Sequence, residues 1–104
     1  MYKPLPDYCT IKSSSIEGLG LFATRFIPSG FDLGMTHIYD SRFPDGVIRL
    51  PLGGFFNHSE TPNCRIEEKF YQDKIHIHHL RLVTIKDIQE NDEITAYYTL
   101  YQPK

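Results

Sequence analysis

No stretch of ten residues in this 104-residue chain carries apolar side chains at the spacing of an amphipathic helix. Short runs of alternating or β-branched residues are separated instead by Gly, Pro, Asn and Asp, which terminate strands and form turns. We therefore predict a mainly β fold with little helix and no internal repeat. The predicted strands cover residues 8–13, 21–24, 31–39, 47–50, 64–71, 74–82, 83–88 and 93–100.

The turn signals indicate how these strands connect. Residues 17–20 and 28–30 are glycine-containing turns, and residues 40–54 contain two Pro and three Gly breakers around one short strand. Residues 64–71 and 74–82 are predicted to pair as a hairpin with its tip at residues 72–73. In the second arm, alternation places Ile75, Ile77 and His79 on one face, and His76 and His78 on the other.

Composition limits the classes of protein that the chain can be. Its length suits one small domain, and 40% hydrophobic residues, with 13% aromatic, predict an aromatic-rich core. A net charge of −2 gives no electrostatic support for direct nucleic-acid binding. Two cysteines, a polar and proline-containing lead-in at residues 1–7, and no long apolar run predict an intracellular, cytoplasmic or nuclear protein without a membrane partner.

The most unusual segment is residues 55–63, with the sequence FFNHSETPN. Two aromatic residues enter it, and the Asn, Ser and Thr side chains that follow hydrogen-bond readily to nearby backbone. The composition indicates a tight, self-bonded turn anchored by Phe55 and Phe56. Such a turn holds backbone groups in a fixed geometry that suits a small polar ligand.

Two further segments accompany this turn: EGLGLFA at residues 17–23 and EITAYY at residues 93–98. In this order, over residues 9–101, the three segments resemble the SET domain of protein lysine methyltransferases. The resemblance implies a SET-domain fold of short twisted sheets with a knot-like C-terminal segment. It also implies that residues 1–104 form a single minimal SET domain, without pre-SET or post-SET zinc regions.

The cofactor that the resemblance implies is S-adenosylmethionine. Gly18, Leu19 and Gly20 match the family's G-x-G loop, which lies against this cofactor, although the middle residue is often aromatic in the family. Asn57 and His58 match the pair that contacts the amino-acid end of the methyl donor. Without the resemblance, the glycines indicate only a turn with positive φ, and an Asn beside a His is more often a structural pair.

The family's catalytic residue aligns with Tyr98, the last residue of the pattern E-[L/I]-T-x-[D/S/N]-Y. Tyr98 is also expected to contact the cofactor and to position the reacting amine rather than act as a simple base, because an ordinary tyrosine pKa is ~10. Tyr97 and Tyr101 are predicted to contact the substrate, and Tyr97 stands where the family often has Asp. Without the resemblance, these tyrosines indicate an aromatic strand that packs a core.

We predict no metal site. His76 and His78 share a predicted strand face, but alternating histidines usually form a solvated face, and Cys9 and Cys64 have no recognised ligand spacing. Many SET enzymes place a zinc-binding Cys after N-H-S, where this chain has Glu60. The C-terminal Cys cluster that completes the family's zinc site is missing as well.

Two functions remain open from the sequence. Asn57, His58 and Tyr98 favour methyl transfer to a lysine of a protein or peptide, with histone tails as one candidate. The short segment 40–54, which replaces a helical insertion of the substrate groove, and Tyr97 favour a catalytically inactive SET-fold binding or scaffold module. A homodimer or an auxiliary protein is a candidate to rebuild the missing wall of the groove.

Overall fold

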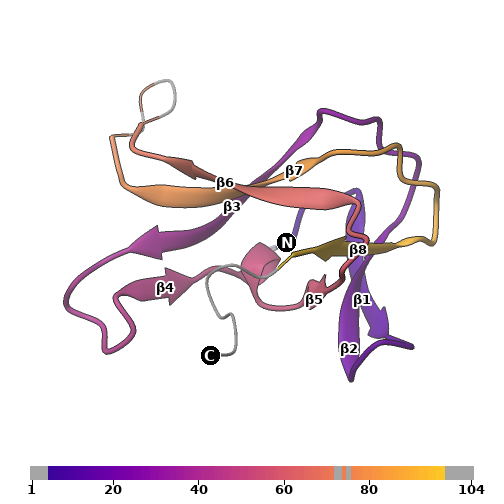
Figure 1. The fold of residues 1–104 in the computed structure, drawn as a ribbon, viewed down its shortest axis with the longest axis horizontal. Coiled ribbons are helices and arrows are strands. Elements are labelled where there is room, and N and C mark those ends of the chain that lie inside the picture. The colour runs from indigo at the N-terminus through magenta and orange to yellow at the C-terminus, as the bar shows by residue number, and fades with distance from the viewer. Residues whose placement is uncertain (1–4, 72–73, 75, 98–104) are drawn as a thin grey trace.

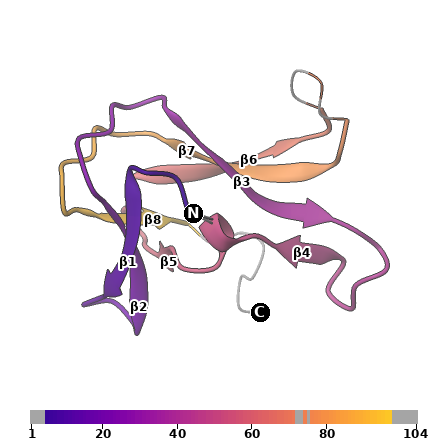
Figure 2. The same ribbon diagram turned by 180° about the vertical axis from the view of Figure 1, so that it is seen from behind.

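The computed structural model describes residues 5–71, 74 and 76–97, and these form a mainly β fold. A single 3-10 turn, η1 (Pro51–Gly53), is the only helical element among the described residues. Figure 1 shows a long, twisted group of strands beside a smaller β1–β2 hairpin, and Figure 2 shows the same arrangement from behind. The strands are β1 (Cys9–Ser13), β2 (Leu19–Ala23), β3 (Asp32–Tyr39), β4 (Val47–Arg49), β5 (Asn57–His58), β6 (Cys64–Lys69), β7 (His79–Thr84) and β8 (Glu93–Ala96).

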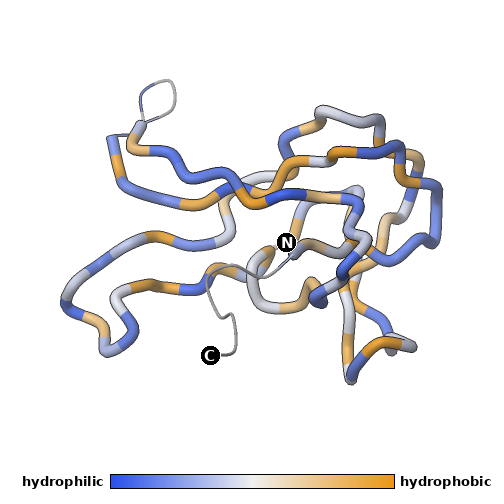
Figure 3. The backbone as a smooth tube through the Cα atoms, in the orientation of Figure 1, coloured by the Kyte–Doolittle hydropathy of each residue, from blue (hydrophilic) through white to orange (hydrophobic). Residues whose placement is uncertain are grey.

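The strands follow the order β1-β2-β8-β6-β7-β3-β4, and β5 pairs with β8 outside this path. Most neighbours are antiparallel, but β5 and β6 both run parallel to β8. The short β8 therefore joins the β1–β2 hairpin to the rest of the sheet. Hydrophobic and hydrophilic residues are interspersed along the long strands, with a hydrophilic run at the end of β6, as the colours in Figure 3 show.

The core lies where these strands meet. Leu21, Leu82 and Ile94 have no exposed surface, and Ile27 and Leu33 are 2% exposed. Aromatic residues close the edges of this core, and they include Tyr8, Phe31 and Phe55, which are partly buried against it, and Phe56, which is buried within it. The predicted aromatic-rich core thus has an aliphatic centre with aromatic residues mainly at its periphery.

Most predicted strands are confirmed, with changes at their ends. β2 begins at Leu19 rather than at residue 21, because Leu19 and Gly20 pair with Ser13 and Lys12 across the hairpin. The predicted strand 83–88 is wrong beyond Thr84; Ile88 makes only an isolated bridge to Ile27. The last predicted strand ends at Ala96 in the described residues. Residues 98–104, at the C-terminal end where a knot-like segment was predicted, lie outside them.

The hairpin of β6 and β7 is confirmed, but its second arm is shorter than predicted. β7 begins at His79, so His76 and His78 precede the strand instead of sharing one of its faces. The His78 ring stacks on Tyr39 at 3.8 Å and on Phe70 at 4.4 Å between ring centroids. The Tyr39 amide also donates to the His78 carbonyl at 3.0 Å, so a backbone hydrogen bond and the ring stack both hold His78 beside β3. The predicted tip at residues 72–73 lies outside the described residues.

Candidate functional site

The two predicted cofactor motifs meet at the turn of the β1–β2 hairpin. Gly18 closes the turn with φ of 47°, and Gly20 lies within β2. Asn57, in β5, donates its side-chain amide toward the carbonyl oxygens of Glu17 at 3.2 Å and Leu19 at 3.4 Å. The segments 17–20 and 57–58 are therefore adjacent in the structure.

Pairing with β8 positions Asn57 and His58. Asn57 lies opposite Thr95 and His58 opposite Ala96 in a parallel arrangement, and the Ser59 amide donates to the Ala96 carbonyl at 3.1 Å. Phe56, just before this pair, is 2% exposed and anchors the segment in the core. The aromatic anchor that the sequence predicted thus holds a polar pair at the edge of the fold.

Asn63 fixes the other end of the same turn. Its amide donates to the Glu93 carbonyl at 2.8 Å, and its Oδ1 accepts from the Thr95 amide at 2.9 Å. One side chain therefore replaces a pair of ladder hydrogen bonds along β8. Asn63 thereby ties the end of the turn at residues 55–63 to β8.

Two further residues complete the cluster, and neither was predicted as a site residue from the sequence. The Glu93 carboxylate accepts from the Asn57 amide at 2.8 Å, and the Ser14 hydroxyl lies 2.8 Å from both of its oxygens. Ser14 Oγ in turn accepts from the Ile16 amide at 2.9 Å. Glu93 was visible as the first residue of its motif, but nothing in the sequence marked Ser14.

Gly20 makes room for this carboxylate. A Cβ atom built on Gly20 would overlap Glu93 Oε2 and would lie 3.0 Å from the Ser14 Cβ. A Cβ on Gly18 would meet nothing within 4 Å. The structure therefore separates the two glycines: Gly18 supplies a positive φ beside open space, and Gly20 admits the carboxylate of Glu93.

His58 faces the end of β8. Its ring lies 4.7 Å from the Tyr97 ring, with the planes inclined at 58°, and its Nε2 lies 3.5 Å from Glu60 Oε1. Tyr97 is 37% exposed and is the last described residue. The predicted catalytic residue Tyr98 and the predicted substrate contact Tyr101 lie outside the described residues.

The buried histidines and the two cysteines come from several different strands. His37 and His79 are buried in β3 and β7, and burial, with a smaller effect of Arg49, lowers the pKa of His37 to about 4. Burial raises the pKa of both Cys9 and Cys64 to about 12. Within residues 5–71, 74 and 76–97, no three His, Cys, Asp or Glu side chains gather at a distance suited to a metal ion.

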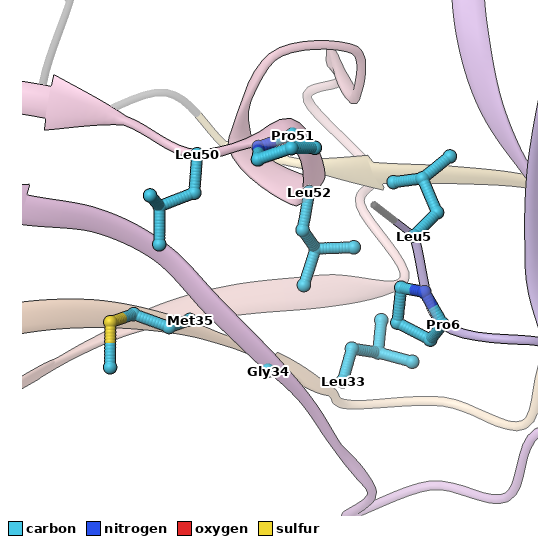
Figure 4. A pocket seen from close by; sticks show the side chains of 8 residues that line it. All are labelled: Leu5, Pro6, Leu33, Gly34, Met35, Leu50, Pro51 and Leu52. Atoms are coloured by element: carbon cyan, nitrogen blue, oxygen red, sulfur yellow. The ribbon is translucent and has the colours of Figure 1, made fainter. Parts of the chain in front are cut away.

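A separate apolar cavity of about 340 Å³ lies between the lead-in, β3 and η1. Figure 4 shows the side chains that converge on it: Leu5, Pro6, Leu33, Met35, Leu50, Pro51 and Leu52, with Gly34 at its wall. None of the predicted cofactor residues lines this cavity. It is therefore distinct from the Asn57–Glu93 cluster.

Comparison with known proteins matches the chain to a family. A family model described as the SET domain matches residues 31–99. A Fusarium mangiferae protein, histone-lysine N-methyltransferase, H3 lysine-9 specific KMT1, is 41% identical over 76 residues, which cover 68% of this chain. That match covers 20% of the relative, so this chain spans about a fifth of the length of the curated relative that it matches.

Solved structures share the fold. A Plasmodium falciparum protein named as a candidate histone methyltransferase matches with a TM-score of 0.71 and 23% identity, over 90% of this chain and 95% of its own. A humanized mutant of the Chaetomium thermophilum Polycomb Repressive Complex 2 matches with a TM-score of 0.71 and 19% identity, over 92% of this chain and 15% of its own. In the described part of the chain, no helix is long and apolar enough to cross a membrane.

Proposed function

Because this chain belongs to the SET domain family, whose members are typically protein lysine methyltransferases, we propose that it transfers a methyl group from S-adenosylmethionine to a lysine side chain of a protein. The observation that carries the proposal is the meeting of Gly18–Gly20 with Asn57 around Glu93. Histone tails are the first substrates to test, because the curated relative is named for histone H3 lysine 9. Such a substrate implies an intracellular, cytoplasmic or nuclear, site of action.

The residues of the cluster fit the amino-acid end of this cofactor. That end carries an ammonium and a carboxylate, and the cluster presents a carboxylate, an amide and the backbone of a turn. Gly18, Leu19, Gly20, Asn57 and His58 would hold the cofactor, with open space beside Gly18. When bound, S-adenosylmethionine supplies an electrophilic methyl group on a cationic sulfonium.

The substrate lysine would be contacted by Tyr97, Tyr98 and Tyr101. A lysine amine has an ordinary pKa of ~10.4 and must lose a proton before it can attack the methyl group. Burial against aromatic side chains favours the neutral amine. Tyr97, beside His58, and Tyr101 are proposed to line the path of the lysine, and Tyr98 to orient its amine. Orientation of this kind is worth on the order of 7–11 kcal/mol in favourable cases.

Cofactor binding is the first test. Thermal unfolding is measured with and without S-adenosylhomocysteine, because a ligand at ~100 times its dissociation constant stabilises by about 2.7 kcal/mol. Transfer of labelled methyl to lysine peptides follows, with Tyr98→Phe as the variant that should abolish it. An unshifted melting curve at millimolar ligand contradicts the proposed function, and an unchanged rate in Tyr98→Phe contradicts only the role of Tyr98.

The alternative, an inactive binding or scaffold module, has one structural observation in its favour. Between β3 and Phe55 the chain forms only β4 and η1, so little material is available for a substrate groove. A second copy of the chain or an auxiliary protein would have to complete that wall. Gel filtration and light scattering test the homodimer, and cofactor binding without methyl transfer to any lysine peptide would favour the inactive module.

A further inference from the structure

Glu93 has an unusual environment for a carboxylate. Its two oxygens are held by the Ser14 hydroxyl and the Asn57 amide, which are neutral groups. Among the residues that the structure describes, no Lys, Arg or His forms an ion pair with Glu93. Its negative charge is therefore partly buried beside Asn57 without a cation to balance it.

This carboxylate determines which way the Asn57 amide faces. Four oxygens surround Asn57 Nδ2, and they belong to Glu93, Ser14, Glu17 and Leu19. The Glu and carbonyl oxygens can only accept hydrogen bonds, and the single Ser14 proton is directed at Glu93. A flipped amide would place Oδ1 against these acceptors. Asn57 is therefore locked with its nitrogen toward these oxygens and its Oδ1 directed away from them.

Asn57 Oδ1 is an acceptor without a hydrogen bond from any described residue, since the hydrogen bonds of this side chain all use Nδ2. An acceptor next to an unbalanced carboxylate suits a cationic donor, because both the hydrogen bond and the charge favour it. The amino-acid end of the methyl donor carries one such group, its α-ammonium. A carboxylate on the ligand would be repelled by Glu93 at the same place.

We propose that Ser14 and Glu93 are positioning residues, which lock Asn57 so that its Oδ1 accepts a hydrogen bond from the α-ammonium of the methyl donor. The inference rests on the proposed function and assigns part of the recognition of the cofactor to residues behind Asn57. Gly20 is part of the same arrangement, because the Glu93 carboxylate can lie where it does only if residue 20 has no Cβ atom.

The test compares two ligands that differ in one group: S-adenosylhomocysteine and its analogue without the α-amino group. Dissociation constants are measured by calorimetry for the wild type, Glu93→Gln and Ser14→Ala. Glu93→Gln is expected to weaken S-adenosylhomocysteine about tenfold, the value of one charge-assisted hydrogen bond, and to leave the desamino analogue within about twofold. Ser14→Ala should act in the same direction with a smaller effect, because the charge remains.

Glu90→Gln is the matched control, since it removes the same charge from an exposed position. It should change neither affinity. Side-chain amide hydrogen exchange of Asn57, measured by NMR without ligand, gives a second reading: the locked amide should exchange more slowly in the wild type than in either variant. If Glu93→Gln fails to fold, the affinities and the Asn57 amide exchange are compared between the wild type and Ser14→Ala alone.

The outcomes separate the inference from the proposed function. If the wild type binds S-adenosylhomocysteine and the variants lose affinity for the two ligands equally, or for neither, the positioning role is wrong. The proposed function is not contradicted by that result. Wild-type protein that binds neither ligand overturns the proposed function and this inference with it. Selective loss of S-adenosylhomocysteine, with slow Asn57 exchange only in the wild type, supports both.

Discussion

Asn57 connects three separate parts of the chain through one amide group. Its nitrogen lies near oxygens of the β1–β2 turn, of Ser14 at the end of β1, and of Glu93 in β8. Each contact is of ordinary length, yet together they allow a single orientation of the side chain. At the scale of the residue, therefore, the orientation of Asn57 is fixed because other orientations of its amide would lose these hydrogen bonds, and not because any one bond is strong.

Gly20 gives the sharpest steric prediction. In Gly20→Ala the new methyl group would overlap the Glu93 carboxylate, which can move only by breaking its bonds to Ser14 and Asn57. We expect a loss of about 1–3 kcal/mol in the free energy of unfolding, as for other overpacked sites, measured by urea denaturation.

The double variant Gly20→Ala, Glu93→Ala is the control for this clash. Removing the carboxylate should relieve the overlap, so the two changes should cost less together than the sum of each alone. Gly46→Ala, at a positive φ of 76° with open space around it, reports the cost of backbone strain without a clash. Additive effects in the double variant would contradict the proposed overlap.

The lowered pKa of His37 predicts how the free energy of unfolding depends on pH. Burial, and then the positive charge of Arg49, lower its pKa to about 4 in the folded protein, against ~6.5 in an unfolded chain. The part of the free energy of unfolding that depends on a neutral His37 ring is therefore fully present above pH 6.5. This contribution is lost as the pH falls toward 4. The linked loss is roughly 2 kcal/mol at pH 5 and about 3 kcal/mol near pH 4.

Urea denaturation of the wild type and His37→Gln at pH 7, 5 and 4 measures this linkage. Carboxylates titrate in both proteins, so the difference between the two pH profiles isolates the histidine. The variant is expected to lose less stability than the wild type on acidification, whatever its stability at pH 7. Parallel profiles would show that His37 does not carry the linkage.

At the scale of the element, local sequence predicted the strands that alternate and end at Gly or Pro turns. β1 and β3 are close to their predicted bounds, and the turns at Gly30 and Asn91 adopt the positive φ that such turns favour. β5 was missed because two residues have no periodicity, and its strand character comes only from pairing with β8. Ring stacking by His78 likewise depends on Tyr39, which lies far away in sequence.

Replacing Asn63 tests how far one side chain fixes β8 in place. In Asn63→Ala the Thr95 amide and the Glu93 carbonyl lose their partners in a partly buried position. We expect a loss of about 2–4 kcal/mol in the free energy of unfolding, since each unsatisfied buried group costs about 1–3 kcal/mol. Hydrogen exchange of the Thr95 amide should accelerate relative to the wild type.

Thr61→Ala is the comparison for this change. Thr61 is exposed in the same turn and bonds only to Ser59 among the described residues, so its loss should leave Thr95 exchange unchanged. If Asn63→Ala and Thr61→Ala had the same small effect, β8 would be held by its strand pairing alone.

For the molecule as a whole, the sequence predicted the family, and the two segments that it proposed for the cofactor are adjacent in the structure. It did not predict that a carboxylate organises them. Ser14 and Glu93 are 79 residues apart, and a serine before a glycine turn has an ordinary local explanation. A contact of this kind requires the three-dimensional arrangement of β1, β2 and β8.

The two cysteines offer a test of whether the chain unfolds as a single domain. Cys9 in β1 and Cys64 in β6 both belong to the central core and are free thiols. Burial raises the pKa of each to about 12, and the neighbouring Cys9 adds to the shift of Cys64. At pH 8 such thiols are thiolates in about one molecule in ten thousand, so the folded protein should resist the thiol reagent DTNB.

Reaction with DTNB across a urea gradient should therefore report global unfolding. In a single cooperative domain, Cys9→Ala and Cys64→Ala proteins, each with one remaining thiol, should become reactive along the same transition, which coincides with the loss of circular dichroism. S-Adenosylhomocysteine should shift both transitions to higher urea by the same amount if it binds the folded state. Reaction of Cys9 at a lower urea concentration than Cys64 would mean that the β1–β2 hairpin, with its half of the proposed cofactor site, opens independently of the main sheet.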